Sequence, residues 1–301
     1  MSRRLAETNA GLCNLESGVE MTFGASVDSR SAHPAFSVLE RAAKVFEGAP
    51  FPSLAVLDDC LSAGAVRNAS GLPLRAIDGD LQNDTAVRYE LRILEQGKLA
   101  VRSDSWHDVF NVLVWRTFPR AKAALNLRHC AELVREPREA IRRGRVRDSL
   151  TLLDESGIIV VASDGSLLEA IRAFRWKEVF WTRRAELLCN LRVYVFGHAL
   201  YEKLISPYIG LTGHAVLLEV ERHLIAAPLT AQLGVLDSML ATVIGDPLRL
   251  ESPRDLQPMP VLGMPCWHSQ TVHESFYDNV SYFRTQRRER KPRAISAARG
   301  G

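Results

Sequence analysis

Residues 106–129 constrain the fold more than any other part of the chain, because two helical patterns meet there at a proline. Pro119 ends the first pattern, since proline removes a backbone donor, and it suits the first position of the next helix. The sequence therefore predicts two consecutive helices, the first starting near Ser105. The apolar positions of the first helix recur at i, i+4, i+7 and i+8 and are Trp106, Phe110, Leu113 and Val114.

Both helices carry a line of short polar or titratable side chains on one face. His107 and Asn111 are four residues apart in the first helix. Lys122, Asn126 and His129 occupy positions i, i+4 and i+7 of the second. Solvent-facing helix surfaces usually carry long charged side chains, so these residue types favour hydrogen bonding to a ligand. A hydrated helix face is the alternative.

His107 and Asp108 lie in the first turn of their helix. The positive end of the helix dipole favours a neutral imidazole and an ionised carboxylate there. This combination suits a general base or metal ligand at His107, supported by Asp108. Helix capping is the alternative for Asp108, because Ser105 and Asp108 have the spacing of a capping box. A structural, hydrogen-bonded ring is the alternative for His107.

Arg120 and Lys122 lie in the first turn of the second helix, where a cation opposes the helix dipole. Their placement becomes favourable if an anion binds there, because free backbone N–H groups and both cations would converge on it. We therefore expect a small anionic ligand at this helix end. Pairing of each cation with a carboxylate elsewhere is the alternative.

His198 and Glu202 are four residues apart on one face of a further expected helix. Two such residues can share a divalent metal ion, with His107 as a further ligand. A buried hydrogen-bonded pair is the alternative. Gly197, directly before the histidine, indicates close approach of another backbone segment.

The periodicity over the whole chain predicts a mainly helical α+β fold, a single domain with short antiparallel β-hairpins. One hairpin is expected over residues 87–101 and another over 149–161, with Asp154 and Glu155 as turn formers. Residues 256–267 are interrupted by prolines and are expected to run extended over the surface. Helices are expected over 36–46, 54–61, 167–189, 194–205 and 230–244, and a strand over 215–220.

The composition is that of a globular protein, since 47% of the 301 residues are hydrophobic and 24% are charged. We expect a loosely ordered leader over residues 1–30, one globular domain over 31–283 and a basic disordered tail over 284–301. The five cysteines show neither a disulfide framework nor zinc-finger spacing. No segment has the apolar length of a signal peptide or membrane span, which predicts a cytoplasmic protein that binds no membrane.

Positive charge is concentrated in two segments. Residues 284–301 contain six arginines and one lysine against one glutamate, and residues 116–147 contain ten arginines or lysines against three glutamates. This distribution supports an alternative function, a non-catalytic protein that binds nucleic acid through its basic segment and tail. The chain lacks the interleaved aromatic platform that such proteins often use.

The string Ser105-Trp-His-Asp-Val-Phe-Asn-Val-Leu-Val-Trp115, continued by Phe118-Pro-Arg-Ala-Lys-Ala-Ala-Leu-Asn126 and His129, resembles the signature of a bacterial family of domains of unknown function, number 3025 in that series. Residues 152–157, 196–202 and 256–263 resemble it as well. The resemblance covers most of residues 35–283 and implies a single-domain bacterial protein. It implies no activity or substrate.

The sequence contains no glycine-rich phosphate loop, no GxSxG elbow and no HExxH motif. We expect an enzyme with an interior polar site, a hydrolase or group transferase acting on a small phosphorylated or carboxylated molecule. A divalent metal ion is expected at His107, His198 and Glu202. The catalytic candidates are His107, Asp108, His198 and Glu202. The ligand-binding candidates are Asn111, Arg120, Lys122, Asn126 and His129.

Overall fold

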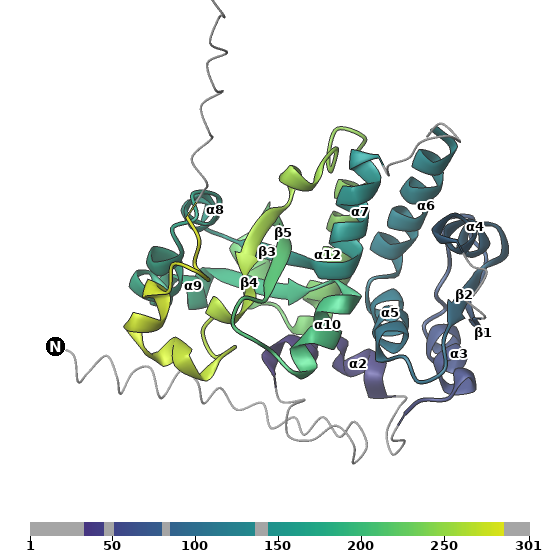
Figure 1. Ribbon diagram of the computed structural model, residues 1–301, viewed down its shortest axis with the longest axis horizontal. Coiled ribbons are helices and arrows are strands. Elements are labelled where there is room, and N and C mark those ends of the chain that lie inside the picture. The colour runs from purple at the N-terminus through teal and green to yellow at the C-terminus, as the bar shows by residue number, and fades with distance from the viewer. Residues whose placement is uncertain (1–32, 45–50, 80–84, 136–143, 286–301) are drawn as a thin grey trace, which may run out of the picture.

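A four-stranded mixed sheet lies near the middle of the protein, and helices flank it on two sides (Figure 1). The computed structural model describes residues 33–44, 51–79, 85–135 and 144–285. β3 (Gly157–Ala162) pairs antiparallel with β4 (Leu191–Val195) and parallel with β5 (Thr212–Glu219), which pairs antiparallel with β6 (Gln257–Pro260). β3 is buried along its whole length, which explains its continuous apolar run.

The two helices that meet at Pro119 are present as predicted. α5 (Trp106–Thr117) is followed by α6 (Pro119–Arg135). Ser105 is the N-cap of α5, since its hydroxyl accepts the backbone N–H of Asp108 at 3.3 Å. α5 is buried from Asp108 to Trp115, and α6 packs against α12 (Leu229–Gly245). The polar faces of both helices are therefore held inside a packed interior.

The two predicted hairpins are wrong. Residues 87–101 form α4 (Ala86–Gln96) and then β2 (Lys98–Val101), which pairs in parallel with β1 (Arg75–Asp78). The glycine of the supposed turn, Gly97, has φ 65° and ends α4 in the left-handed conformation of a helix C-cap. Residues 149–156 belong to α7 (Arg145–Ser156), which leads directly into β3. Short apolar runs of this kind fit either period, so pattern alone misassigned them.

Two other segments differ from the expectation. The helix expected over residues 194–205 is divided between β4 and α10 (His198–Ile205), because residues 191–195 pair with β3 at an edge of the sheet. Residues 256–267 do not cover the surface: they form β6 and bury Leu256, Met259 and Leu262. The prolines are tolerated because β6 is an edge strand.

The helices expected over residues 54–61 and 230–244 and the strand expected over 215–220 are present with shifted ends. The helix expected over 167–189 is divided into three shorter helices, and the one expected over 36–46 is described as far as residue 44. The remaining helices are η2 (Pro34–Leu39), α2 (Glu40–Ala43), α3 (Leu54–Ala63), α8 (Gly165–Arg172), η5 (Glu178–Thr182), α9 (Arg184–Asn190), α11 (Arg222–Ala226), η6 (Pro253–Asp255), η7 (Val261–Gly263), η8 (Ser269–Val272) and η9 (Glu274–Asp278).

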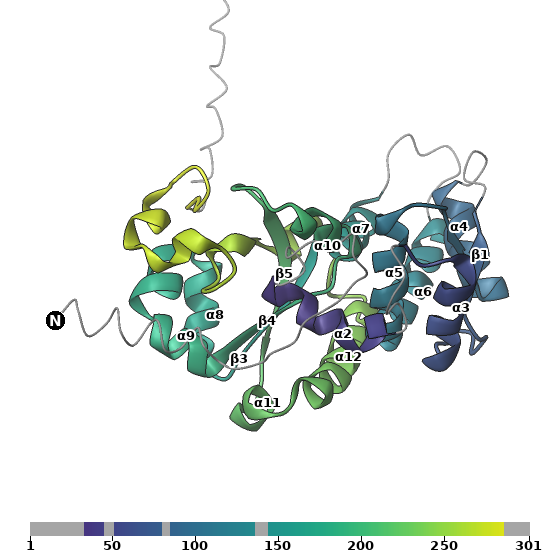
Figure 2. The same cartoon turned by 90° about the horizontal axis from the view of Figure 1, so that it is seen from below.

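Helices α8 and α9 lie at one end of the sheet, and α5, α6, α7 and α10 lie toward the other (Figures 1 and 2). α10 packs against both α5 and α7. This arrangement confirms a mainly helical α+β domain and brings the start of α5, the end of α7 and the start of α10 together. No helix in the described ranges is long and apolar enough to cross a bilayer. The predicted leader, and the tail beyond residue 285, lie outside the described residues.

Candidate metal centre

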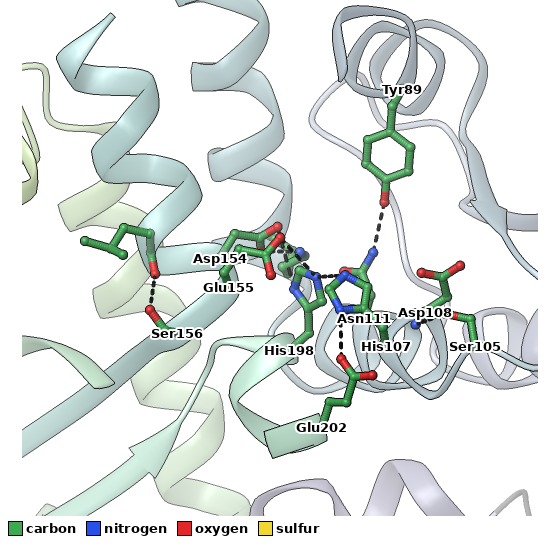
Figure 3. A network of polar contacts seen from close by, with 12 residues as sticks. Tyr89, Ser105, His107, Asp108, Asn111, Asp154, Glu155, Ser156, His198 and Glu202 are labelled. Atoms are coloured by element: carbon green, nitrogen blue, oxygen red, sulfur yellow. Dashed lines mark hydrogen bonds and ion pairs between the residues drawn. The ribbon is translucent and has the colours of Figure 1, made fainter. Parts of the chain in front are cut away.

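Two histidines from different helices meet where α5 and α10 pack together (Figure 3). His107 lies in the first turn of α5 and His198 is the first residue of α10. Their Nε2 atoms are 3.0 Å apart, and the ring planes make an angle of 76°. The His198 side chain is buried, whereas 29% of the His107 side chain is exposed. The pair therefore lies at the boundary between the core and the solvent.

Gly197 makes this approach possible. The backbone N–H groups of Phe196 and Gly197 both donate to the carbonyl oxygen of Gly157 at 2.9 Å. A Cβ at Gly197 would collide with the backbone nitrogens of Gly157 and Ser156. The predicted close approach at Gly197 is confirmed, and it presses the start of α10 against the last turn of α7.

Each histidine faces a carboxylate with its outer ring nitrogen. His107 Nδ1 lies 3.3 Å from Oε2 of Glu202, and His198 Nδ1 lies 3.8 Å from Oδ2 of Asp154. Glu202 favours a proton on Nδ1 of His107, whereas Nδ1 of His198 has no hydrogen-bond partner among the described residues. The two Nε2 atoms form a hydrogen bond at 3.0 Å if one of them carries a proton, and they present lone pairs to each other if both rings are protonated on Nδ1. Facing lone pairs repel unless a cation lies between them, so the arrangement suits a shared metal ion.

Glu155 supplies a third ligand atom, since its Oε1 lies 3.8 Å from Nε2 of His198. One ligand atom each from His107, Glu155 and His198 lies within 4.8 Å of the others. Two nitrogens bound at about 2.1 Å and at right angles to one metal ion are roughly 3.0 Å apart. Glu202, the carboxylate expected from the sequence to bind the metal, lies on the Nδ1 side of His107, and the group of residues that could share an ion contains Glu155 instead.

Lys122 holds Asp154 behind His198. Its ammonium group, only 4% exposed, forms an ion pair with Oδ1 of Asp154. Burial opposes ionisation of Asp154, but Lys122 outweighs it and holds the pKa of Asp154 below its ordinary value. The carboxylate beside His198 is therefore charged at neutral pH.

The protonation states of His198 and Glu155 follow from their surroundings. Burial lowers the pKa of His198 to about 3, so its imidazole is neutral at neutral pH and one ring nitrogen keeps a lone pair. Burial, together with the neighbouring Asp154, raises the pKa of Glu155. A nearby cation would stabilise the ionised form of Glu155, which burial and Asp154 disfavour.

Asp108 does not support His107 as predicted. Its carboxylate accepts hydrogen bonds from the backbone N–H, Nε and Nη2 of Arg102 at 2.8, 2.9 and 2.8 Å. The Ser105 hydroxyl accepts the backbone N–H of Asp108. The Asp108 carboxylate, however, binds Arg102 and does not complete a capping box. Asp108 thus fixes the loop between β2 and α5 and, through it, the first turn that carries His107.

The anion site predicted at the start of α6 is also corrected, because an internal carboxylate binds there. Asp237 of α12 accepts the backbone N–H groups of Arg120 and Ala121 at 3.2 and 2.8 Å. The Arg120 guanidinium donates to Oγ of Ser238 at 2.5 Å, and Lys122 pairs with Asp154. Arg120 and Lys122 are thus both bonded to other groups of the protein, as the alternative interpretation of this helix end expected.

Asn111 and Asn126 lie in the interior between α4, α5 and α6. Asn111 donates to the hydroxyl of Tyr89 at 2.9 Å (Figure 3). Asn126 donates to the backbone oxygen and the carboxylate of Glu90 at 2.9 and 2.7 Å. Among the described residues, neither asparagine side-chain oxygen has a hydrogen-bond partner, although both are buried. His129 is buried on α6, and its electrostatic interaction with Asp154 lowers the pKa of that carboxyl. These groups extend the polar interior beyond the histidine pair.

Four residues of this region were missing from the sequence-based set, because the predicted hairpins concealed them. They are Tyr89, Glu90, Asp154 and Glu155. A helical signal for α7 was present in the sequence, since Val146, Leu150 and Leu153 recur at i, i+4 and i+7. With α7 assigned as a helix, both carboxylates would have been placed at its C-terminal end.

The family model described as a protein of unknown function (DUF3025) matches residues 74–287, which is most of the chain. The chain belongs to this family. The DUF3025 match includes both histidines, Glu155 and Glu202 of the candidate metal centre. Neither the curated proteins nor the solved structures include a match to the chain.

Proposed function

We propose that this DUF3025 protein is a metal-dependent hydrolase or group transferase whose divalent cation is bound by His107, His198 and Glu155. The observation that carries the proposal is the 3.0 Å approach of two Nε2 atoms whose Nδ1 atoms each face a carboxylate. Two histidines and one carboxylate leave a coordination position for water or substrate, as in catalytic zinc sites.

The exposure of the ligands supports access from one side. The side chains of His107, Glu155 and Glu202 are 29%, 42% and 48% exposed. On the opposite side, His198 and Lys122 are buried and fix the centre against the core. A substrate would approach from the exposed side, while the buried side keeps the ligands in place.

The chemistry follows from the cation. A bound divalent ion polarises a carbonyl or phosphoryl oxygen and lowers the pKa of a bound water, which generates a nucleophile near neutral pH. A small phosphorylated or carboxylated substrate would place one anionic oxygen on the ion. The cation would thereby take the anion-binding role that Arg120 and Lys122 cannot serve, because both are bonded within the protein.

Metal analysis tests the proposal. Protein dialysed against Zn²⁺ or Mn²⁺ and then washed is expected to retain a single divalent ion per chain, measured by plasma mass spectrometry. His107→Ala and Glu155→Gln should each lose it. His223→Ala is the matched control, because that exposed ring lies on α11 and outside the centre.

Activity is measured on p-nitrophenyl phosphate and p-nitrophenyl acetate, which report phosphoryl and acyl transfer. Turnover should follow the metal content across the variants. Wild-type protein that binds no divalent ion, or variants that bind it as well as the wild type does, would rule out this centre.

Nucleic-acid binding is the second candidate from the charge pattern, and the described cations of the basic segment give it less support. Arg128, for example, donates to the backbone oxygens of Ile244, Asp246 and Arg249. Affinity for single-stranded DNA that falls steeply with salt, and that weakens on removal of residues 286–301, would favour this alternative.

A further inference from the structure

A cavity is lined by residues of α8, β5 and the loop that follows α12. Its volume is about 390 Å³, and none of its lining residues belongs to the metal centre. Small-molecule sites commonly have volumes of roughly 300–1,000 Å³. The cavity is therefore large enough for a small metabolite.

Three arginines line this cavity and give it a positive charge. Arg172 ends α8, Arg249 lies in the loop after α12, and Arg254 lies in η6. Within the described part of the chain, none of the three guanidinium groups forms an ion pair or a hydrogen bond. The lining set contains one carboxylate, Asp255, which accepts the backbone N–H of Ser252 at 2.9 Å. The cations thus outnumber the carboxylate, and the carboxylate is engaged elsewhere.

Hydrogen bonds from α6 hold the backbone that carries Arg249. The guanidinium of Arg128, on α6, donates to the carbonyl oxygens of Ile244, Asp246 and Arg249 at 2.8, 3.0 and 2.6 Å. These bonds clamp the loop to the end of α12. A clamped loop loses little conformational entropy when a ligand binds.

The backbone that carries Arg254 is fixed as well. Ser252 and Asp255 form a capping box around η6, in which the Ser252 hydroxyl accepts the backbone N–H of Arg254 at 3.3 Å. Gln257, another lining residue, donates to the carbonyl oxygen of Ile171 at 3.2 Å and ties the strand to α8. The backbone that carries the arginines is therefore held in place before any ligand arrives, while their exposed guanidinium groups remain unpaired within the described residues.

We propose that this arginine cavity, lined by Arg172, Arg249 and Arg254, binds a small molecule that carries a phosphate or pyrophosphate group. A planar guanidinium donates paired hydrogen bonds to phosphate oxygens, and several cations suit a group with more than one negative charge. Val243 and Leu248 of the lining offer an apolar surface to the rest of the molecule. The site is independent of the metal centre.

Calorimetric titration with inorganic pyrophosphate tests this site. The wild-type protein is expected to bind it saturably. Arg249→Gln and Arg254→Gln should each weaken binding by about tenfold, since each removes a charge-assisted contact. Arg222→Gln is the matched control, because Arg222 is equally exposed, lies on α11 and outside the cavity. Thermal melts check that every variant is folded.

The titration is repeated with His107→Ala after chelation, because pyrophosphate also binds metal ions. Unchanged affinity in this variant assigns the binding to the arginine cavity. Loss of binding in His107→Ala, absence of saturable binding to the wild type, or equal weakening by Arg222→Gln would overturn the proposal. Binding of single-stranded DNA that depends on Arg249 and Arg254, without pyrophosphate binding, would overturn it as well.

Discussion

Each histidine of the pair has a carboxylate near its Nδ1 atom. Glu202 faces Nδ1 of His107 at 3.3 Å and Asp154 faces Nδ1 of His198 at 3.8 Å. In metal sites, a carboxylate hydrogen-bonded to a histidine ligand orients the ring and raises its basicity, and Glu202 lies within hydrogen-bond distance of His107. The sequence predicted the two histidines and Glu202 from their spacing, but it assigned Glu202 to the metal and left Asp154 in a turn. Spacing reports the face of a helix and cannot report which atom of a ring a carboxylate meets.

Glu202→Gln is expected to weaken metal affinity by about 10- to 100-fold while the fold is retained, because the carboxylate orients His107 without binding the metal. The dissociation constant for zinc is measured by competition with a chromogenic chelator. Glu221→Gln, an exposed glutamate outside the centre, is the control. Equal affinity in the two variants would show that Glu202 does not position His107.

Lys122→Met is expected to lower the free energy of unfolding by about 3–5 kcal/mol, because it leaves the carboxylate of Asp154 without its buried cation. Urea denaturation measures this value. The double variant Lys122→Met with Asp154→Asn should recover part of the loss, since it removes the unpaired charge. Additive losses would mean that the two residues do not act as a pair.

Burial of the Glu90 carboxyl raises its pKa from 4.5 to about 7, although Asn126 donates a hydrogen bond to it. Between these two values the folded state binds more protons than the unfolded state, so the free energy of unfolding falls as pH rises through this window. The expected fall is at most about 3 kcal/mol.

Glu90→Gln should flatten this dependence, because glutamine keeps an acceptor for Asn126 and does not titrate. The free energy of unfolding is measured between pH 4.5 and 8 for both proteins. Glu95→Gln, an exposed residue on the same helix, should behave like the wild type. An unchanged pH slope in Glu90→Gln would assign the dependence to other groups.

Elements with strong local signals were predictable. α5 and α6 have a serine cap at Ser105 and a proline at Pro119, and both signals act within a few residues. α4 and β4 were not, because their short apolar runs fit a strand or a helix equally. α7 has helical spacing, but the apolar run of β3 follows it directly and favoured a hairpin. Their identity depends on distant partners: β4 is a strand because residues 191–195 pair with β3, and α7 packs against α6 and α10. Tertiary contacts therefore decided what local pattern left open.

Gly197→Ala is expected to destabilise the protein by more than about 1 kcal/mol and to weaken metal binding, because its Cβ would push α10 away from the end of α7. Gly234→Ala is the matched control on α12, where a Cβ meets nothing within 4 Å. That change should stabilise the helix by up to about 1 kcal/mol. Thermal melts measure the stability of both variants, and zinc titration measures their metal affinity. A Gly197→Ala variant with unchanged stability and metal affinity would show that the close approach is not required.

At the scale of the molecule, the centre depends on the meeting of α5, α7 and α10, which come from distant parts of the chain. His107 and His198 are 91 residues apart in sequence. The mainly helical α+β class followed from composition and periodicity, whereas the convergence of these helices follows from the sheet, because β3 leads out of α7 and β4 leads into α10. One sequence alone carries no record of that pairing. The anion site at α6 failed for the same reason, since Asp237 lies more than a hundred residues away.

X-ray absorption spectroscopy on the zinc-loaded protein tests whether the histidine pair binds metal. We expect a zinc shell of two imidazole nitrogens at about 2.0–2.1 Å with carboxylate and water oxygens, and loss of one imidazole in His198→Ala. A shell without imidazole, or a spectrum unchanged by His198→Ala, would contradict a metal centre at the histidine pair.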